Sequence, residues 1–167
     1  MRFLLPLSHS LMIYFSSLLL IMSVLSFLYS TFIALVQVDL KKIIAYSSIS
    51  HMSLFLIGIS LNSYYSFIGS WLMLLAHGFV SGALFFLIGI IYVRFNTRLL
   101  KYFSGLSVFS DKINFFFFFF MFANIGFPGS INFISEFLIF IGIIPKLNIF
   151  FVILLGIGFI TSLLYSI

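Results

Sequence analysis

The chain has 167 residues, of which 63% are hydrophobic and only 7% are charged, and its formal net charge is +5. A soluble domain needs roughly a quarter of its residues charged to keep its surface hydrated. The composition therefore excludes a soluble fold and predicts an all-α polytopic membrane protein. Cysteine is absent, which excludes disulfide frameworks and cysteine-based zinc or iron–sulfur sites.

Apolar runs long enough to span a bilayer follow one another along the chain. A spanning helix needs roughly 18 or more apolar residues, and five such runs cover residues 10–36, 43–61, 67–93, 113–144 and 149–167. Arg2 precedes a short apolar stretch, as in a signal peptide, but the first run is too long for one and lacks a small-residue cleavage site. The sequence thus predicts a single membrane domain over 1–167, with a polar loop at 94–112.

The basic residues divide unevenly between the two sides of such a bundle. Six of them lie on one side, namely Lys41, Lys42, Arg94, Arg98, Lys101 and Lys112, whereas Arg2 and Lys146 lie on the other. Because cations mark the cytoplasmic or matrix side, the N-terminus is predicted to face outward and the C-terminus inward. The positive charge is therefore a topology signal, and no nucleic-acid partner is expected.

Three ionisable residues, His51, His77 and Glu136, lie well inside the apolar runs, about 10–16 Å from the nearer helix end. Burying an ionisable group in a membrane costs free energy, so each of these residues is expected to have a structural or functional role. Glu136 follows Pro128 and Gly129, which predict that the fourth helix is discontinuous there. A broken helix beside a buried ionisable group is typical of ion sites in transporters. The alternative is an ordinary proline kink with a neutral, hydrogen-bonded Glu136.

The two histidines allow two interpretations each. His77, flanked by Ala76 and Gly78, can relay protons near neutral pH or simply hydrogen-bond to a backbone carbonyl. His51 shares a helix face with Ser47 and Ser50, and this face either lines a hydrated path or holds helices together. We attribute the phenylalanine run at 115–120 to biased amino-acid composition and assign no function to it.

Three segments, residues 39–52, 75–78 and 123–136, resemble segments of the antiporter-like subunits of respiratory complex I. The resemblance extends to their sequences, their order and their spacing. These subunits are related to Mrp-type cation/proton antiporters. Glu136 stands where two of the three antiporter-like subunits typically have lysine, so the chain is most similar to the chain 4 members. The resemblance implies that the five runs correspond to family helices nine to thirteen, the C-terminal half of the subunit.

That resemblance also implies a function. The chain would be a non-redox subunit of NADH:ubiquinone oxidoreductase, with Glu136, His77 and His51 on a proton-translocation path. It would bind no cofactor itself, whereas the whole complex would use NADH, FMN, iron–sulfur clusters and ubiquinone. Its expected location is the mitochondrial inner membrane, with the N-terminus in the intermembrane space and the C-terminus in the matrix.

The family's other buried ionisable residues belong to helices upstream of anything in this chain. We therefore expect a split subunit, in which a separate chain carries helices one to eight, alongside the other membrane-arm subunits and the lipid bilayer. Two other functions remain open: a structural remnant without a pumping role, and a stand-alone cation/proton antiporter. The absence of an inverted-repeat mate argues against the antiporter.

Overall fold

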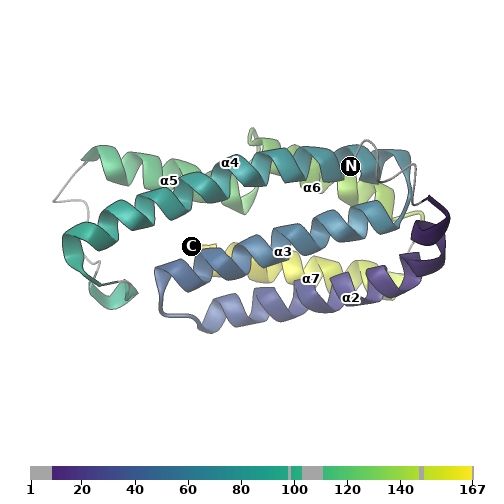
Figure 1. Ribbon diagram of the computed structural model, residues 1–167, viewed down its shortest axis with the longest axis horizontal. Helices are drawn as coiled ribbons and strands as arrows, with labels where there is room; N and C mark the ends of the chain where they lie inside the picture. Colours follow the sequence, from purple (N-terminus) through teal and green to yellow (C-terminus); the bar gives the residue numbers. More distant parts are fainter. Residues whose placement is uncertain (1–8, 98, 103–110, 147–148, 167) are drawn as a thin grey trace.

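The computed structural model describes residues 9–97, 99–102, 111–146 and 149–166. These residues form α2 (His9–Val36), α3 (Leu40–Ser60), α4 (Tyr64–Phe95), the 3-10 helix η1 (Leu100–Tyr102), α5 (Asp111–Ile125), α6 (Ile131–Ile143) and α7 (Ile149–Ser166). No strand occurs within these ranges, and one isolated bridge joins Asp39 to Leu99. The predicted all-α fold is confirmed (Figure 1).

The helices follow the five predicted runs, with one division and some shifted ends. The fourth run is two helices, α5 and α6, so the predicted discontinuity is confirmed. The second helix begins at Leu40 rather than at residue 43, because the Asp39 carbonyl accepts hydrogen bonds from the N–H groups of Lys42 (2.9 Å) and Ile43 (3.0 Å). The two lysines are exposed on this first turn, where long cationic side chains can reach water.

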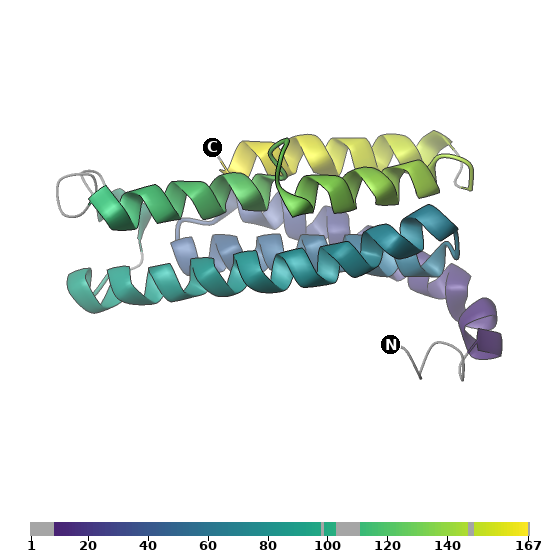
Figure 2. The same ribbon diagram turned by 90° about the horizontal axis from the view of Figure 1, so that it is seen from above.

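The helices run along a common long axis, and α5 and α6 follow one another with their connection near the middle of the bundle (Figure 2). Three segments, Tyr14–Val36, Leu40–Ser60 and Tyr64–Phe95, are each long and apolar enough to cross a membrane. The 13-residue α6 is too short to cross alone. It completes a crossing only together with α5.

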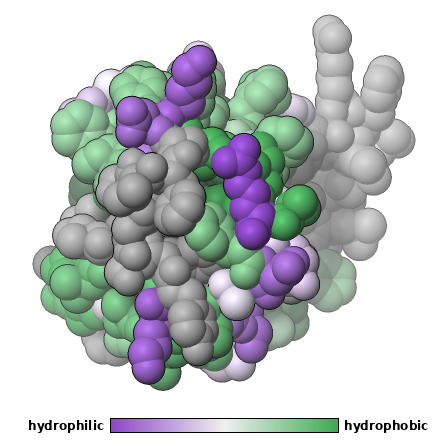
Figure 3. Space-filling model, turned by 90° about the vertical axis from the view of Figure 1, so that its left-hand side faces the viewer, coloured by the Kyte–Doolittle hydropathy of each residue, from purple (hydrophilic) through white to green (hydrophobic). Residues whose placement is uncertain are grey.

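The connections alternate between the two ends of the bundle. At one end, the N–H of Leu100 donates to the carbonyl of Val38 (3.1 Å), which joins the segment after α4 to the turn after α2. Hydrophilic side chains gather on this end (Figure 3). At the other end, the ammonium group of Lys146 donates to the carbonyls of Leu61 (2.6 Å) and Asn62 (3.1 Å). The predicted grouping of chain segments by end is therefore confirmed for the described residues, and Arg2 lies outside them.

Polar residues separate two apolar clusters inside the bundle. The first cluster includes Leu54, Met73 and Ile139, and the second includes Ile44 and Leu84. Between them along α3, α4, α5 and α6 lie buried polar residues, which we call the polar layer: Ser47, Ser50, His51, Ser53, His77, Asn124, Asn132, Ser135 and Glu136. The polar layer is thus shielded by apolar side chains towards each end.

Glycines allow α4 and α6 to pack closely beside this layer. A Cβ atom at Gly69 would lie 2.8 Å from the carbonyl oxygen of Ser135 and 2.9 Å from the backbone nitrogen of Ile139. A Cβ atom at Gly142 would lie 2.6 Å from the Cβ of Ser66. Because small residues let helix backbones approach in membranes, these two positions hold α6 against α4.

We expect Gly69→Ala to destabilise the protein by about 1–3 kcal/mol, because the methyl group would meet backbone atoms that cannot move alone. The change in stability would be measured by thermal unfolding in the membrane, with the loss of protease resistance as the signal. Gly89→Ala on the same helix is the control, since a Cβ there meets no atom within 4 Å. An equal loss of stability in both variants would contradict the packing argument.

Candidate functional site

The site is built on the break between α5 and α6. Gly126 and Gly129 have φ values of +76° and +106°, which glycine adopts readily, and Pro128 between them has no N–H to donate. The N–H of Gly126 donates to Ala123 (3.3 Å) and that of Phe127 to Phe122 (3.2 Å). The helix therefore ends in a tight turn rather than in a proline kink.

The second half-helix starts with a side-chain cap. The hydroxyl oxygen of Ser130 accepts a hydrogen bond from the N–H of Phe133 (3.2 Å). This bond satisfies one of the amide groups that every helix leaves free in its first turn. The chain can therefore resume a helix in mid-bundle without an unpaired amide at this point.

Two asparagine side chains tie the break together. The side-chain amide of Asn132 donates to the carbonyl oxygen of Ala123 at 2.9 Å, which links α6 back to the last turn of α5. The side-chain amide of Asn124 donates to the hydroxyl of Ser47 at 3.4 Å, which links α5 to α3. The carbonyl of Ala123, near the end of α5, thus has a side-chain donor.

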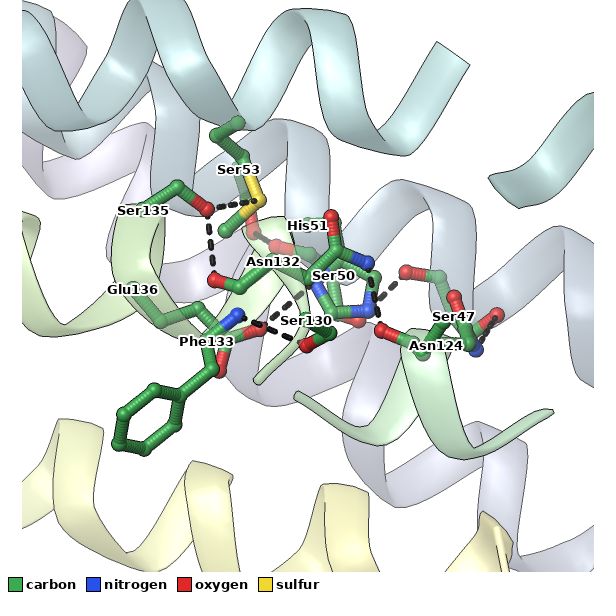
Figure 4. Close-up of polar contacts among 12 residues, drawn as sticks. Ser47, Ser50, His51, Ser53, Asn124, Ser130, Asn132, Phe133, Ser135 and Glu136 are labelled. Atoms are coloured by element: carbon green, nitrogen blue, oxygen red, sulfur yellow. Dashed lines mark hydrogen bonds and ion pairs between the residues drawn. The ribbon is translucent and has the colours of Figure 1, made fainter. Parts of the chain in front are cut away.

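The three predicted ionisable residues lie together in the polar layer. The Oε1 atom of Glu136 is 3.3 Å from Nδ1 of His51, an ion-pair distance without the alignment of a hydrogen bond (Figure 4). The rings of His51 and His77 lie 5.3 Å apart between centroids, at 38° to one another. All three residues are at most 7% exposed. His51 is therefore a neighbour of both Glu136 and His77.

Unpaired polar atoms are concentrated at this site. Among the described residues, five buried side-chain atoms have no hydrogen-bond partner: both ring nitrogens of His51, Nδ1 of His77, and the Oδ1 atoms of Asn124 and Asn132. Each such atom costs about 1–3 kcal/mol when it is left unsatisfied. All five belong to the polar layer, so it retains the capacity to bind water or to exchange protons.

The charged residues at the bundle ends lie apart from the polar layer. Lys42 forms an ion pair with Asp39 at 3.4 Å, and Lys146 caps the C-terminus of α3. These residues therefore lie at helix ends, outside the polar layer. Arg98 and most of the predicted 94–112 loop lie outside the described residues. Within the described part of the chain, no group of three or more His, Cys, Asp or Glu residues could hold a metal ion.

The contact between His51 and Glu136 did not follow from the sequence. The two residues lie on α3 and α6, and their contact depends on how these helices are rotated against each other. The sequence feature that pointed towards this contact was the stripe of Ser47, Ser50 and His51, because it predicted a polar face on α3. All three residues are indeed buried on that face.

These features define a polytopic helical membrane protein with an ionisable site at a discontinuous helix. A family model for the NADH:quinone oxidoreductase/Mrp antiporter transmembrane region matches residues 1–164. The chain belongs to this family.

The chain is similar to the NADH-ubiquinone oxidoreductase chain 4 of Chondrus crispus, with 45% identity over 83% of this chain and 28% of that protein. It is 39% identical to chain 4 of Arabidopsis thaliana, over 99% of this chain and 33% of that one. Among solved structures, respiratory complex I from Thermus thermophilus with bound NADH matches with a TM-score of 0.90 and 28% identity, over 99% of this chain and 35% of that chain.

The predicted resemblance to the antiporter-like subunits of complex I, and to chain 4 among them, is confirmed by these relatives. The chain spans about a third of their length.

We expect Asn132→Ala to loosen the break, because the carbonyl of Ala123 loses its side-chain donor. A single hydrogen bond contributes about 0.5–1.5 kcal/mol, so amide hydrogen exchange across residues 123–132 should become about two- to tenfold faster. Asn114→Ala is the control, since Asn114 is on α5 but outside the polar layer. Unchanged exchange in Asn132→Ala would show that the bond does not hold the break.

Proposed function

We propose that this chain forms part of a transmembrane proton-translocation path in the membrane arm of a proton-pumping NADH:ubiquinone oxidoreductase. The observation that carries the proposal is the buried series Glu136, His51 and His77 beside a broken helix. The Glu136 carboxylate lies 3.3 Å from one ring nitrogen of His51, and the His77 ring lies next to the His51 ring. Family membership and the chain 4 relatives support the same function.

The series suits proton transfer because of imidazole chemistry. A neutral imidazole carries a proton on one ring nitrogen and accepts one on the other, so His51 can take a proton from Glu136 at Nδ1 and release one at Nε2. His77 is the next ionisable group in that direction. The unpaired amide oxygens of Asn124 and Asn132 offer hydrogen-bond acceptors to water molecules along the route.

The rest of the antiporter-like module would complete the path. A positive charge arriving beside Glu136 favours the carboxylate form, and its departure favours the protonated form. In this proposal, α2, α3, α4, the α5–α6 pair and α7 correspond to family helices nine to thirteen. That a separate chain supplies helices one to eight stays a prediction, and finding all fourteen helices in one polypeptide of the same complex would overturn it.

In the assembled enzyme, this chain would be a subunit without redox chemistry and would bind no cofactor of its own. NADH, FMN, iron–sulfur clusters and ubiquinone would be bound elsewhere in the complex. The eukaryotic chain 4 relatives favour the mitochondrial inner membrane. The excess of cations at one end of the bundle favours a matrix location for that end, with the N-terminus in the intermembrane space.

We expect Glu136→Gln to lower the number of protons pumped per electron while leaving the complex assembled. Removing a positioned proton-transfer group typically costs about 10²–10⁴-fold in rate, so pumping through this module should fall at least about tenfold. The measurement is the proton-to-electron stoichiometry of the purified complex in liposomes, with the amount of assembled complex determined in parallel.

Asp111→Asn is the matched control, because it neutralises an exposed acid at the start of α5. This variant should pump like the wild type. Wild-type stoichiometry in Glu136→Gln would contradict the proposal and favour a purely structural subunit. Proton antiport by the isolated, monomeric chain in liposomes would favour the stand-alone antiporter.

A further inference from the structure

One face of the Glu136 carboxyl group lies against the backbone of the helix break. A Cβ atom at Gly126 would lie 2.6 Å from Oε2 of Glu136, 3.3 Å from its Cδ and 3.5 Å from its Oε1. Real Cβ atoms essentially never approach another heavy atom to under 3.0 Å. The carboxylate therefore occupies space that is free only because residue 126 has no side chain.

We propose that Gly126 is a positioning residue, which sets where the Glu136 carboxylate lies relative to His51. This inference rests on the proposed function, in which Glu136 exchanges protons with His51. Oε1 of the carboxylate lies 3.3 Å from the His51 ring, and Oε2 lies over Gly126. The carboxylate is thus in contact with an imidazole on α3 and with a stretch of backbone at the break that carries no side chain.

Steric confinement matters here because hydrogen bonds do not fix the carboxylate. Among the described residues, the side chain of Glu136 has His51 as its polar contact and receives no hydrogen bond. A glutamate side chain has three rotatable bonds, so its end group needs contacts to hold it. His51 contacts one oxygen of the carboxyl group, and the backbone at Gly126 lies closest to the other.

Adding a methyl group at residue 126 would move the carboxylate. Ordinary van der Waals contact begins at 3.4 Å, and the Cβ would start at 2.6 Å from Oε2, so the oxygen must shift by about 0.8 Å. Proton transfer requires heavy atoms within about 2.6–3.2 Å of each other or one bridging water. The Glu136–His51 distance of 3.3 Å lies just beyond this range, so a shift of this size decides whether small movements of the carboxylate can bring the two groups into range.

Gly129 supplies a control within the same turn. It also has a positive φ, +106°, so an alanine there meets comparable or greater backbone strain. A Cβ at Gly129, however, has nothing within 4 Å. Comparing Gly126→Ala with Gly129→Ala thus separates displacement of the carboxylate from strain in the break.

The ionisable groups that face the carboxylate are His51 on α3 and His77 beyond it on α4. On α5, Asp111 and Lys112 lie in the first turn, at the far end from the break. Glu136 is the only ionisable residue within α6. A change in the protonation of Glu136 in Gly126→Ala would therefore reflect its new position among these two histidines.

The test measures the placement of Glu136 without relying on pumping. The assembled complex is treated with dicyclohexylcarbodiimide, which adds to a protonated carboxyl group in an apolar setting and leaves a mass label. Mass spectrometry of the peptide that contains residue 136 then gives the initial labelling rate over a range of pH, with Glu136→Gln as the unlabelled reference. Proton pumping is recorded on the same preparations.

We expect the labelling rate of Glu136 in Gly126→Ala to differ at least about threefold from wild type, as for directly contacting residues. Its pH profile should shift, and its pumping should fall. Gly129→Ala should retain the wild-type labelling rate and pH profile of Glu136, because a Cβ there meets no atom within 4 Å. Equal labelling in wild type and Gly126→Ala, or equal changes in both glycine variants, would overturn the proposal.

A second variant covers the case in which Gly126→Ala does not assemble. Glu136→Asp shortens the side chain and withdraws the carboxylate from residue 126, so Gly126→Ala combined with Glu136→Asp should assemble as well as Glu136→Asp alone. Assembly no better than that of Gly126→Ala would overturn the positioning role. Wild-type pumping in Glu136→Gln would instead refute the proposed function. The difference in labelling rate between Gly126→Ala and Gly129→Ala would still show whether Gly126 positions the Glu136 carboxylate.

Discussion

The structure depends on one constraint: inside a membrane, backbone amides and ionisable groups must find their partners within the protein. Residues 126–130 leave the helix in the middle of the bundle, and Glu136 follows in the second turn of α6. Asn132 meets the constraint by donating to the carbonyl of Ala123, and Ser130 meets it by capping α6. The broken helix and the buried acid are therefore parts of one arrangement.

The polar layer is retained in spite of its energetic cost. Five of its buried atoms lack partners among the described residues, whereas buried polar groups are normally hydrogen-bonded. Apolar clusters on both sides would favour replacing these residues by leucine or phenylalanine, which are abundant elsewhere in the chain. Natural proteins depart from the packing rules in this way at functional sites, here at a group of ionisable residues.

The sequence predicted those features that depend on local chemistry. The apolar runs, the break at Pro128 and Gly129, and the burial of Glu136, His51 and His77 all follow from residue type and spacing. Contacts between helices could not be predicted in this way. The approach of Glu136 to His51 and to Gly126 depends on the rotation and depth of α6 against its neighbours, which hydropathy does not determine.

The two halves of the broken helix are held very differently. Glycines at residues 69 and 142 bring α6 against α4, whereas Asn124 is the buried residue of α5. Because α6 is held by backbone contacts, displacing it as a unit would disturb the first apolar cluster, to which Ile139 and Ile143 belong. The Glu136 carboxylate is instead positioned by contacts at the end of its side chain, with His51 and with the backbone at Gly126, so that small movements of it leave α6 in place. Proton transfer at this site is therefore better served by small movements of the carboxylate than by a shift of the helix.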